Sequence, residues 1–165
     1  MLASSNCYTA ILIVKGETSW NCGTRSKKPS ASFAYYPDVL ELASNSDALI
    51  VCCSLTQETY HIINEEVMRA LGKRGVVVNV GRGPLIDEAR MVEWSVHGDL
   101  GGAGLDVFEH EPKVPKELLG LDNVVLSSHC AVITPESFQA VQDLTVNNLI
   151  AFFANKPLVS VVQFQ

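Results

Sequence analysis

Short apolar runs rich in β-branched residues alternate with helix-like patterns from residue 37 onward, and this alternation constrains the fold more than any other feature. Four runs are typical of strands, at 47–53, 76–80, 102–107 and 124–127. Because each run is almost continuously apolar, we expect parallel strands that are buried on both faces and joined by right-handed crossovers. The sequence therefore predicts an α/β fold, an incomplete doubly wound (Rossmann-type) parallel sheet with flanking helices.

Capping residues mark where the helices begin and end. Three helices are predicted over 64–71, 87–97 and 134–154. Their first residues are of types that cap a helix N-terminus, and a glycine closes each of the first two helices. These capping residues are Asn64, Asp87, Thr134, Gly72 and Gly98.

The N-terminal stretch differs from the rest of the chain. Residues 1–23 contain one candidate strand, Ala10–Val14, and no clear helix. We expect 1–23 to form an atypical N-terminal segment, 24–155 a truncated dinucleotide-binding domain, and 156–165 a C-terminal tail. The Gly-x-Gly-x-x-Gly fingerprint of such domains does not occur in the sequence.

Composition limits the classes of partner that the chain is expected to bind and the compartment that it suits. The net charge of −6 makes the chain a poor general nucleic-acid binder. No apolar stretch approaches the length of a membrane span, and no secretory signal is evident. The five cysteines lack the spacing of a disulfide framework or a zinc site, and the adjacent pair Cys52–Cys53 suits a reducing compartment. We therefore expect a cytoplasmic protein without a metal, a membrane or a nucleic-acid partner.

Three polar residues follow predicted strands closely enough to meet at one edge of the sheet. Arg82, Glu111 and His129 each come two to four residues after an apolar run. A guanidinium can fork onto a carboxylate, and a carboxylate beside an imidazole stabilises its protonated form, which can protonate a carbonyl. The set therefore points to an α-keto acid as ligand. The alternative for Arg82 is a surface arginine in the tight turn Gly81–Gly83, and the alternative for His129 is a structural histidine without a role in catalysis.

Two further positions are candidates for a dinucleotide. Thr24–Lys28 is a basic cluster in an acidic chain, suited to a 2′-phosphate, or else an ordinary solvated loop. Asp106 ends a glycine-rich strand and could accept a hydrogen bond from the nicotinamide amide, or else cap a turn. Of the remaining histidines, we expect His110 to be solvated and His61 and His97 to be structural.

These motifs resemble the D-isomer-specific 2-hydroxyacid dehydrogenases, most of all plant hydroxyphenylpyruvate, hydroxypyruvate and glyoxylate reductases. The resemblance covers about 24–161. It rests on the segments Thr24-Arg25-Ser26-Lys27-Lys28-Pro29, Glu41–Asp47, Leu55–Thr59, Asn79-Val80-Gly81-Arg82-Gly83-Pro84 and Leu100–Glu109.

The resemblance implies an NAD(P)H-dependent reductase of small 2-oxo acids. By the matching positions, Arg82 would bind the carboxylate and carbonyl of the substrate, His129 would protonate the carbonyl oxygen, and Glu111 would hydrogen-bond His129. Members of the family commonly dimerise through the cofactor domain, which would allow a homodimer.

The resemblance also implies the cofactor and the residues that contact it. NADP is expected, with NAD as the alternative. The 2′-phosphate would be received by the loop residues Thr24, Arg25 and Ser26. The other positions that match cofactor contacts are Leu55, Thr56, Val80 and Asp106.

Departures from the family pattern bear on activity. The separate substrate domain, the first strand and the Gly-rich phosphate loop of the family have no counterpart in this sequence, so we expect weak NADPH binding and negligible turnover of hydroxypyruvate. A non-catalytic binding module and a non-functional gene fragment remain alternatives.

Two further departures bear on stability. Ser95 stands where the family has an apolar leucine, and Trp94 stands where it has a small residue. A buried serine or an overpacked tryptophan would each cost on the order of 1–3 kcal/mol of folding stability.

Overall fold

The computed structural model describes residues 11–15, 18–22, 36 and 38–161. The chain divides into two compact units, Met1–His129 and Cys130–Gln165. The first unit holds a six-stranded sheet, and the second holds one long helix. The predicted domain boundaries after residues 23 and 155 stay a prediction, because the division into units reflects contacts within the fold and does not test where one domain of the sequence ends.

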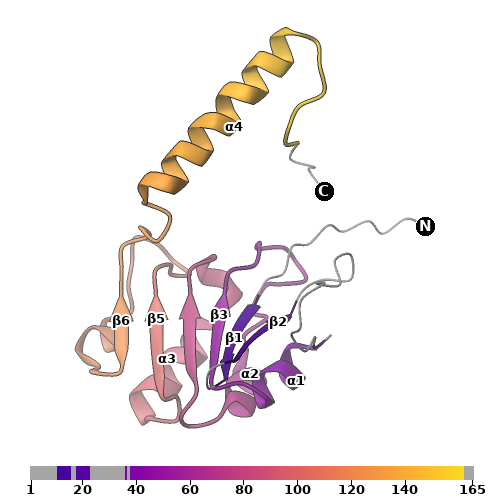
Figure 1. Cartoon of the computed structure of the whole chain (residues 1–165). Helices are drawn as coiled ribbons and strands as arrows, with labels where there is room; N and C mark the ends of the chain where they lie inside the picture. The colour runs from indigo at the N-terminus through magenta and orange to yellow at the C-terminus, as the bar shows by residue number, and fades with distance from the viewer. Residues whose placement is uncertain (1–10, 16–17, 23–35, 37, 162–165) are drawn as a thin grey trace. The chain divides into compact units, whose positions relative to one another are not determined.

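Four parallel strands form the main part of the sheet, as predicted (Figure 1). The strand order across the whole sheet is β2-β1-β3-β4-β5-β6. The strands end one or two residues earlier than their apolar runs, since the last residues of each run already belong to the loop that follows. The four parallel strands are β3 (Ala48–Val51), β4 (Val76–Asn79), β5 (Gly102–Leu105) and β6 (Val124–Leu126).

An antiparallel hairpin completes the sheet beside β3. The predicted N-terminal strand is confirmed as β1 (Ile11–Lys15), which pairs antiparallel with both β3 and β2 (Thr18–Cys22). Strand β2 was not predicted, because its polar sequence carries no apolar run and only its pairing with β1 identifies it. Ile11 pairs with Cys22 on one side and Val51 on the other, so β2 and β3 end at the same edge of the sheet.

Three short helices accompany these strands, namely α1 (Val39–Ser44), α2 (Glu65–Leu71) and α3 (Glu88–His97). The predicted N-caps of the latter two are confirmed, because the side chains of Asn64 and Asp87 accept hydrogen bonds from backbone N–H groups in the first turn. Helix α1 was not predicted. Six residues are too few to show a helical period, and the Asp38 cap becomes visible only in the folded chain.

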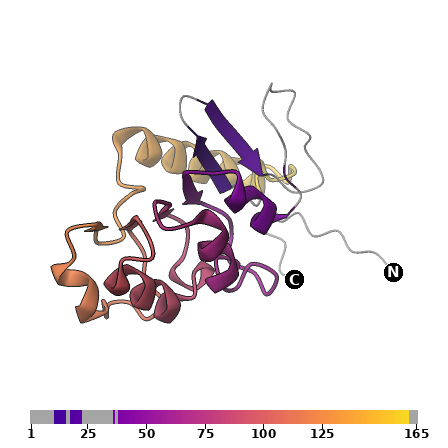
Figure 2. The ribbon, with the colours of Figure 1, turned by 90° about the horizontal axis from the view of Figure 1, so that it is seen from below.

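All three helices lie on one face of the sheet (Figures 1 and 2). Successive crossovers run in the same direction, from β3 to β4 to β5, and right-handed connections of this kind place their helices on the same side. Burial alternates accordingly along β3 and β4. In β3, Leu49 and Val51 are buried whereas Ala48 and Ile50 are half-buried. The prediction that the strands are buried on both faces is therefore wrong for the described residues.

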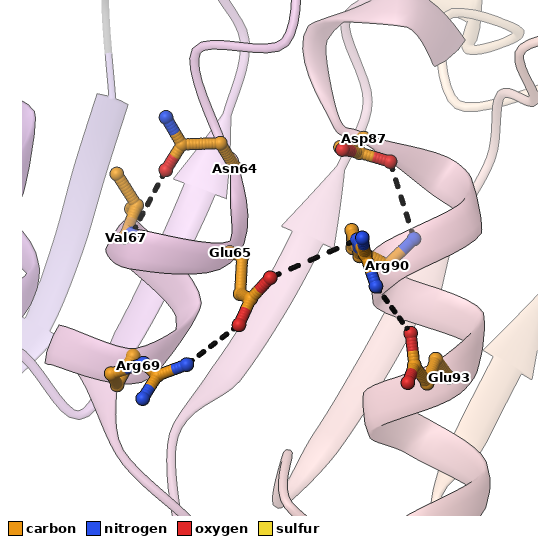
Figure 3. Close-up of polar contacts among 7 residues, drawn as sticks. All are labelled: Asn64, Glu65, Val67, Arg69, Asp87, Arg90 and Glu93. Carbon is orange, nitrogen blue, oxygen red and sulfur yellow. Dashed lines mark hydrogen bonds and ion pairs between the residues drawn. The ribbon is translucent and has the colours of Figure 1, made fainter.

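Polar contacts join α2 to α3 across their exposed sides (Figure 3). Glu65 accepts a hydrogen bond from Arg69 one turn later at 2.6 Å and lies 3.7 Å from the Nε atom of Arg90. Arg90 also pairs with Glu93 at 2.9 Å. Exposed ion pairs of this kind contribute little individually, so the packing of apolar side chains beneath them, including Met68 and Met91, holds the two helices together.

The two unusual residues on α3 have different environments. Ser95 is buried at 3% exposure, as predicted, and its hydroxyl donates to the sulfur of Met91 at 3.7 Å. Trp94 is only half-buried, and the Arg69 guanidinium lies 5.7 Å from the centroid of its ring. The expected overpacking by Trp94 is therefore wrong, because the ring covers the rim of the core instead of entering it.

The second unit is built on α4 (Pro135–Phe153). The predicted boundaries are confirmed: Thr134 accepts a hydrogen bond from the Ser137 N–H at 3.2 Å, and the helix closes at Ala154. Asn148 holds the chain that follows, because its Oδ1 atom accepts from the N–H of Val159 at 2.9 Å. Within the described ranges, no helix has the length and apolar character needed to span a membrane.

Candidate active site

The three predicted chemical residues all lie in the first unit, in loops at the carboxyl edge of the parallel strands. Arg82 follows β4, Glu111 follows β5 and His129 follows β6. The structure brings two of them into direct contact, with His129 Nδ1 2.9 Å from Glu111 Oε2. Their side chains are 43% and 38% exposed, so a ligand can reach the pair.

Glu111 is held in its ionised form. The hydrogen bond from His129, the Phe108 N–H that donates at 3.1 Å and the charges of His129 and Arg82 lower the pKa of Glu111. An ionised carboxylate can only accept hydrogen bonds, so His129 donates its Nδ1–H to Glu111. The other ring nitrogen, Nε2, is then the one that can exchange a proton with a ligand. The backbone of His129 is also held, because its N–H donates to the Asp106 carbonyl at 2.8 Å.

The loop that carries Arg82 is clamped by a buried amide. Asn79, which is 1% exposed, donates from Nδ2 to the Arg82 carbonyl at 2.9 Å and accepts the Gly81 N–H at 3.0 Å. The exposed Arg82 side chain uses one N–H to reach the Gly81 carbonyl at 2.7 Å. A guanidinium has five N–H donors, so this arrangement leaves a fork that can bind a carboxylate.

A cavity of about 450 Å³ opens at this edge, between the loops that follow β3 and β4. Two predicted cofactor contacts, Leu55 and Val80, line it, and each is 40% exposed. The third, Thr56, lies in the next turn, where its N–H donates to Thr59 Oγ1 at 2.7 Å. A Cβ on Gly81 would lie 2.8 Å from Leu85 Cδ1, so a larger residue there would require the Leu85 side chain to shift. The residues lining it are Cys52, Cys53, Ser54, Leu55, Val80, Gly81 and Arg82.

Asp106 joins two of the site strands. Its carboxylate is 5% exposed and accepts a hydrogen bond from the hydroxyl of Ser127 at 2.6 Å. Asp106 lies directly after β5 and Ser127 directly after β6, so this bond fixes the start of the loop that carries His129. Ser127 was not predicted as a site residue. Its position between an apolar strand and His129 was the available signal.

Two sets of residues remain to be placed, the predicted 2′-phosphate contacts and the histidine His61. The predicted 2′-phosphate loop, Thr24, Arg25 and Ser26, lies outside the described residues. His61, which was predicted to be structural, pairs with Glu109 at 3.1 Å close to the Arg82 loop. No local pattern in the sequence indicates this pair, because the two residues are 48 positions apart.

Known proteins are similar to this chain in sequence and in fold. Residues 19–131 match the family described as D-isomer specific 2-hydroxyacid dehydrogenase, NAD binding domain. The chain is 57% identical over 155 residues to glyoxylate/hydroxypyruvate reductase HPR3 of Arabidopsis thaliana, covering 92% of this chain and 48% of that protein. It is 56% identical over 139 residues to hydroxyphenylpyruvate reductase of Plectranthus scutellarioides, covering 84% of this chain and 44% of that protein.

A solved structure has the same fold. The NADPH-dependent glyoxylate/hydroxypyruvate reductase of Sinorhizobium meliloti, in complex with NADP and malonate, superposes with a TM-score of 0.78 at 41% identity. The match covers 84% of this chain and 44% of that chain. The chain therefore spans about half the length of the relatives it matches.

Proposed function

Because the chain belongs to the family of D-isomer-specific 2-hydroxyacid dehydrogenases, in its NAD-binding domain, we propose that it carries the carboxylate-binding and proton-donating residues for NAD(P)H-dependent reduction of a 2-oxo acid. The observation that carries the proposal is the contact of 2.9 Å between His129 and an ionised Glu111, in the field of Arg82. The substrates named for the similar reductases, glyoxylate, hydroxypyruvate and hydroxyphenylpyruvate, all share the carboxylate and adjacent carbonyl that such a set recognises.

The residues divide the work between binding and proton transfer. Arg82 forks onto the substrate carboxylate and orients the carbonyl beside it. His129, protonated and oriented by Glu111, gives the proton on Nε2 to the carbonyl oxygen as negative charge develops there. The chemistry that a reduced nicotinamide supplies when bound is transfer of a hydride to the carbonyl carbon, so that the products are a 2-hydroxy acid and the oxidised cofactor.

The described residues fit one half of a dinucleotide better than the other. The cavity is lined by the apolar side chains of Leu55 and Val80 next to Arg82, which suits a flat nicotinamide ring. NADP is favoured over NAD by the basic residues of the segment Thr24–Lys28, which follows β2 in the sequence. Pyrophosphate commonly binds where a parallel strand leads into a helix N-terminus. In the described residues, β1 occupies the position next to β3 but runs in the opposite direction.

This reversed strand favours a second candidate function, ligand binding without turnover. A strand that runs toward the far edge cannot deliver a phosphate-binding helix to the site. The weak NADPH binding and negligible turnover expected from the sequence therefore stay our prediction for this chain.

We also propose a cytoplasmic location and a homodimer. The location is supported by the adjacent Cys52 and Cys53, which suit a reducing compartment.

Oxalate, a compact dicarboxylate mimic of a 2-oxo acid, tests the proposal on the chain itself. Calorimetry should show oxalate binding to the wild-type chain and binding about tenfold weaker for Arg82→Lys, because an ammonium cannot form the fork. Arg74→Lys, at the opposite edge of the sheet, should bind as wild type does. Equal affinity for all three proteins would overturn the proposal. Steady NADPH oxidation with hydroxypyruvate, abolished in Arg82→Ala, would instead contradict binding without turnover.

A further inference from the structure

His61 and Glu109 form a polar pair outside the residues assigned to the reaction. His61 Nε2 lies 3.1 Å from Glu109 Oε1, and the two side chains are 28% and 16% exposed. Tyr60 adds a second donor, with its hydroxyl 3.3 Å from the same oxygen, and its ring stacks on the His61 ring at 4.0 Å between centroids. Desolvation and the Glu109 carboxylate raise the pKa of Tyr60, so its hydroxyl stays protonated and remains a donor.

The His61 end of the pair is attached to the Arg82 loop. The His61 N–H donates to the Pro84 carbonyl at 2.9 Å, and the Ile63 N–H donates to the Leu85 carbonyl at 3.0 Å. His61 adopts a left-handed backbone conformation with φ of 50°. Such a conformation is uncommon for a residue with a side chain and persists only where surrounding contacts hold it. Hydrogen bonds therefore hold both the backbone and the ring of His61 in this position.

The Glu109 end is attached to the loop of Glu111. Glu109 lies two residues before Glu111, and its N–H donates to Glu88 Oε2 at 2.9 Å. Its peptide group also packs against the Arg82 loop, because a Cβ on Gly83 would lie 2.4 Å from the Glu109 nitrogen. The pair therefore spans the two loops that carry the carboxylate-binding and proton-orienting groups.

We propose that His61 and Glu109 are positioning residues that set the Arg82 loop against the Glu111 loop. This inference rests on the proposed function, since it concerns the geometry of the same site. The two residues reach the reacting groups only through the backbone of residues 82–84 and 109–111. Breaking the pair should loosen both loops while leaving the core unchanged, since the neighbouring core residues Ile63 and Leu85 are fully buried whereas the His61 and Glu109 side chains are partly exposed.

Two substitutions at His61 separate its side chain from its backbone. Asn tolerates a positive φ but is too short to reach Glu109, so His61→Asn removes the link and keeps the turn. Gln places an amide N–H close to the position of Nε2, so His61→Gln restores the link. His97→Asn, at the exposed end of α3, is the matched control.

The readouts are oxalate affinity and the ¹³C titration of the Glu111 carboxylate, with urea unfolding as a check on folding. We expect His61→Asn to weaken oxalate binding by about tenfold and to raise the pKa of Glu111 toward its ordinary value. His61→Gln and His97→Asn should match the wild type in both measurements. A merely structural role would shift the urea midpoint and leave both site readouts unchanged, which would overturn the proposal.

Failure of the proposed function would look different. If the wild-type chain binds no oxalate, the proposed function fails, and the Glu111 titration alone still decides the positioning role. If His61→Asn does not fold, Glu109→Ala provides the second variant, because it removes the carboxylate oxygen that accepts from Tyr60 and His61. Weaker oxalate binding and a raised pKa of Glu111 in that variant support the proposal, and wild-type behaviour overturns it.

Discussion

Gly83 packs directly on the backbone of Phe108, so close that a Cβ on Gly83 would lie 2.0 Å from the Phe108 carbonyl carbon. This contact joins the loop after β4 to the loop after β5 without any side chain between them. It explains in steric terms why glycine follows Arg82, and it adds backbone packing to the His61–Glu109 pair as a second contact that relates the Arg82 loop to the Glu111 loop.

Gly83→Ala should therefore destabilise the chain by about 1–3 kcal/mol, since one loop must move away from the other. Urea unfolding measures this loss. Gly120→Ala is a matched control, because a Cβ there meets nothing within 4 Å. The control should stay within about 0.5 kcal/mol of wild type. Equal stability of the two variants would show that the loops do not pack as described.

Glu111 should titrate below the ordinary carboxyl value of 4.5, and ¹³C NMR of the Glu side chains can follow it. His129→Gln should raise the pKa of Glu111, because the hydrogen bond from His129 is the largest cause of the lowering. A lowered folded-state pKa contributes stability that is present above the unfolded pKa and is lost as the pH falls through the folded pKa. The stability of Glu111→Gln should accordingly depend less on pH below 4.5. An unchanged Glu111 titration in His129→Gln would contradict the pairing.

Asn79→Asp should weaken both folding and ligand binding. The substitution replaces the Nδ2 donor, which bonds the Arg82 carbonyl at 2.9 Å, by an acceptor buried at the same position. Two acceptors facing each other in a buried place should cost about 2–3 kcal/mol. Urea unfolding and oxalate calorimetry measure the two effects. Asn123→Asp, whose Nδ2 atom makes only a long contact of 3.4 Å to the Leu100 carbonyl, should cost less and bind oxalate as wild type does.

Ser95→Ala should stabilise the chain. The Ser95 hydroxyl is buried, and the partner found for it in the described residues is the weakly accepting sulfur of Met91. Removing the hydroxyl relieves part of its desolvation cost, and alanine has the higher helix propensity, which together should add about 0.5–1 kcal/mol. A rise in the urea midpoint would support this account. A fall would show that the hydroxyl contributes more to packing than it costs.

Local signals in the sequence were sufficient for most of the regular structure. Capping residues such as Asn64, Asp87 and Thr134 determine where helices begin, because each satisfies N–H groups within three residues of itself. The short elements α1 and β2 were not predictable in this way. Helix α1 has too few residues to show a period, and β2 is defined by hydrogen bonds to β1 and not by its own polar sequence.

By itself the sequence determined the parallel α/β order and placed Arg82, Glu111 and His129 after successive strands, because apolar periodicity and strand direction are written locally. Only the tertiary structure decided that one face of the sheet is covered and that β1 runs in reverse beside β3. It also decided that His61 meets Glu109 across 48 residues. These outcomes depend on contacts between segments far apart in the chain, and a local pattern cannot encode the distance between two loops.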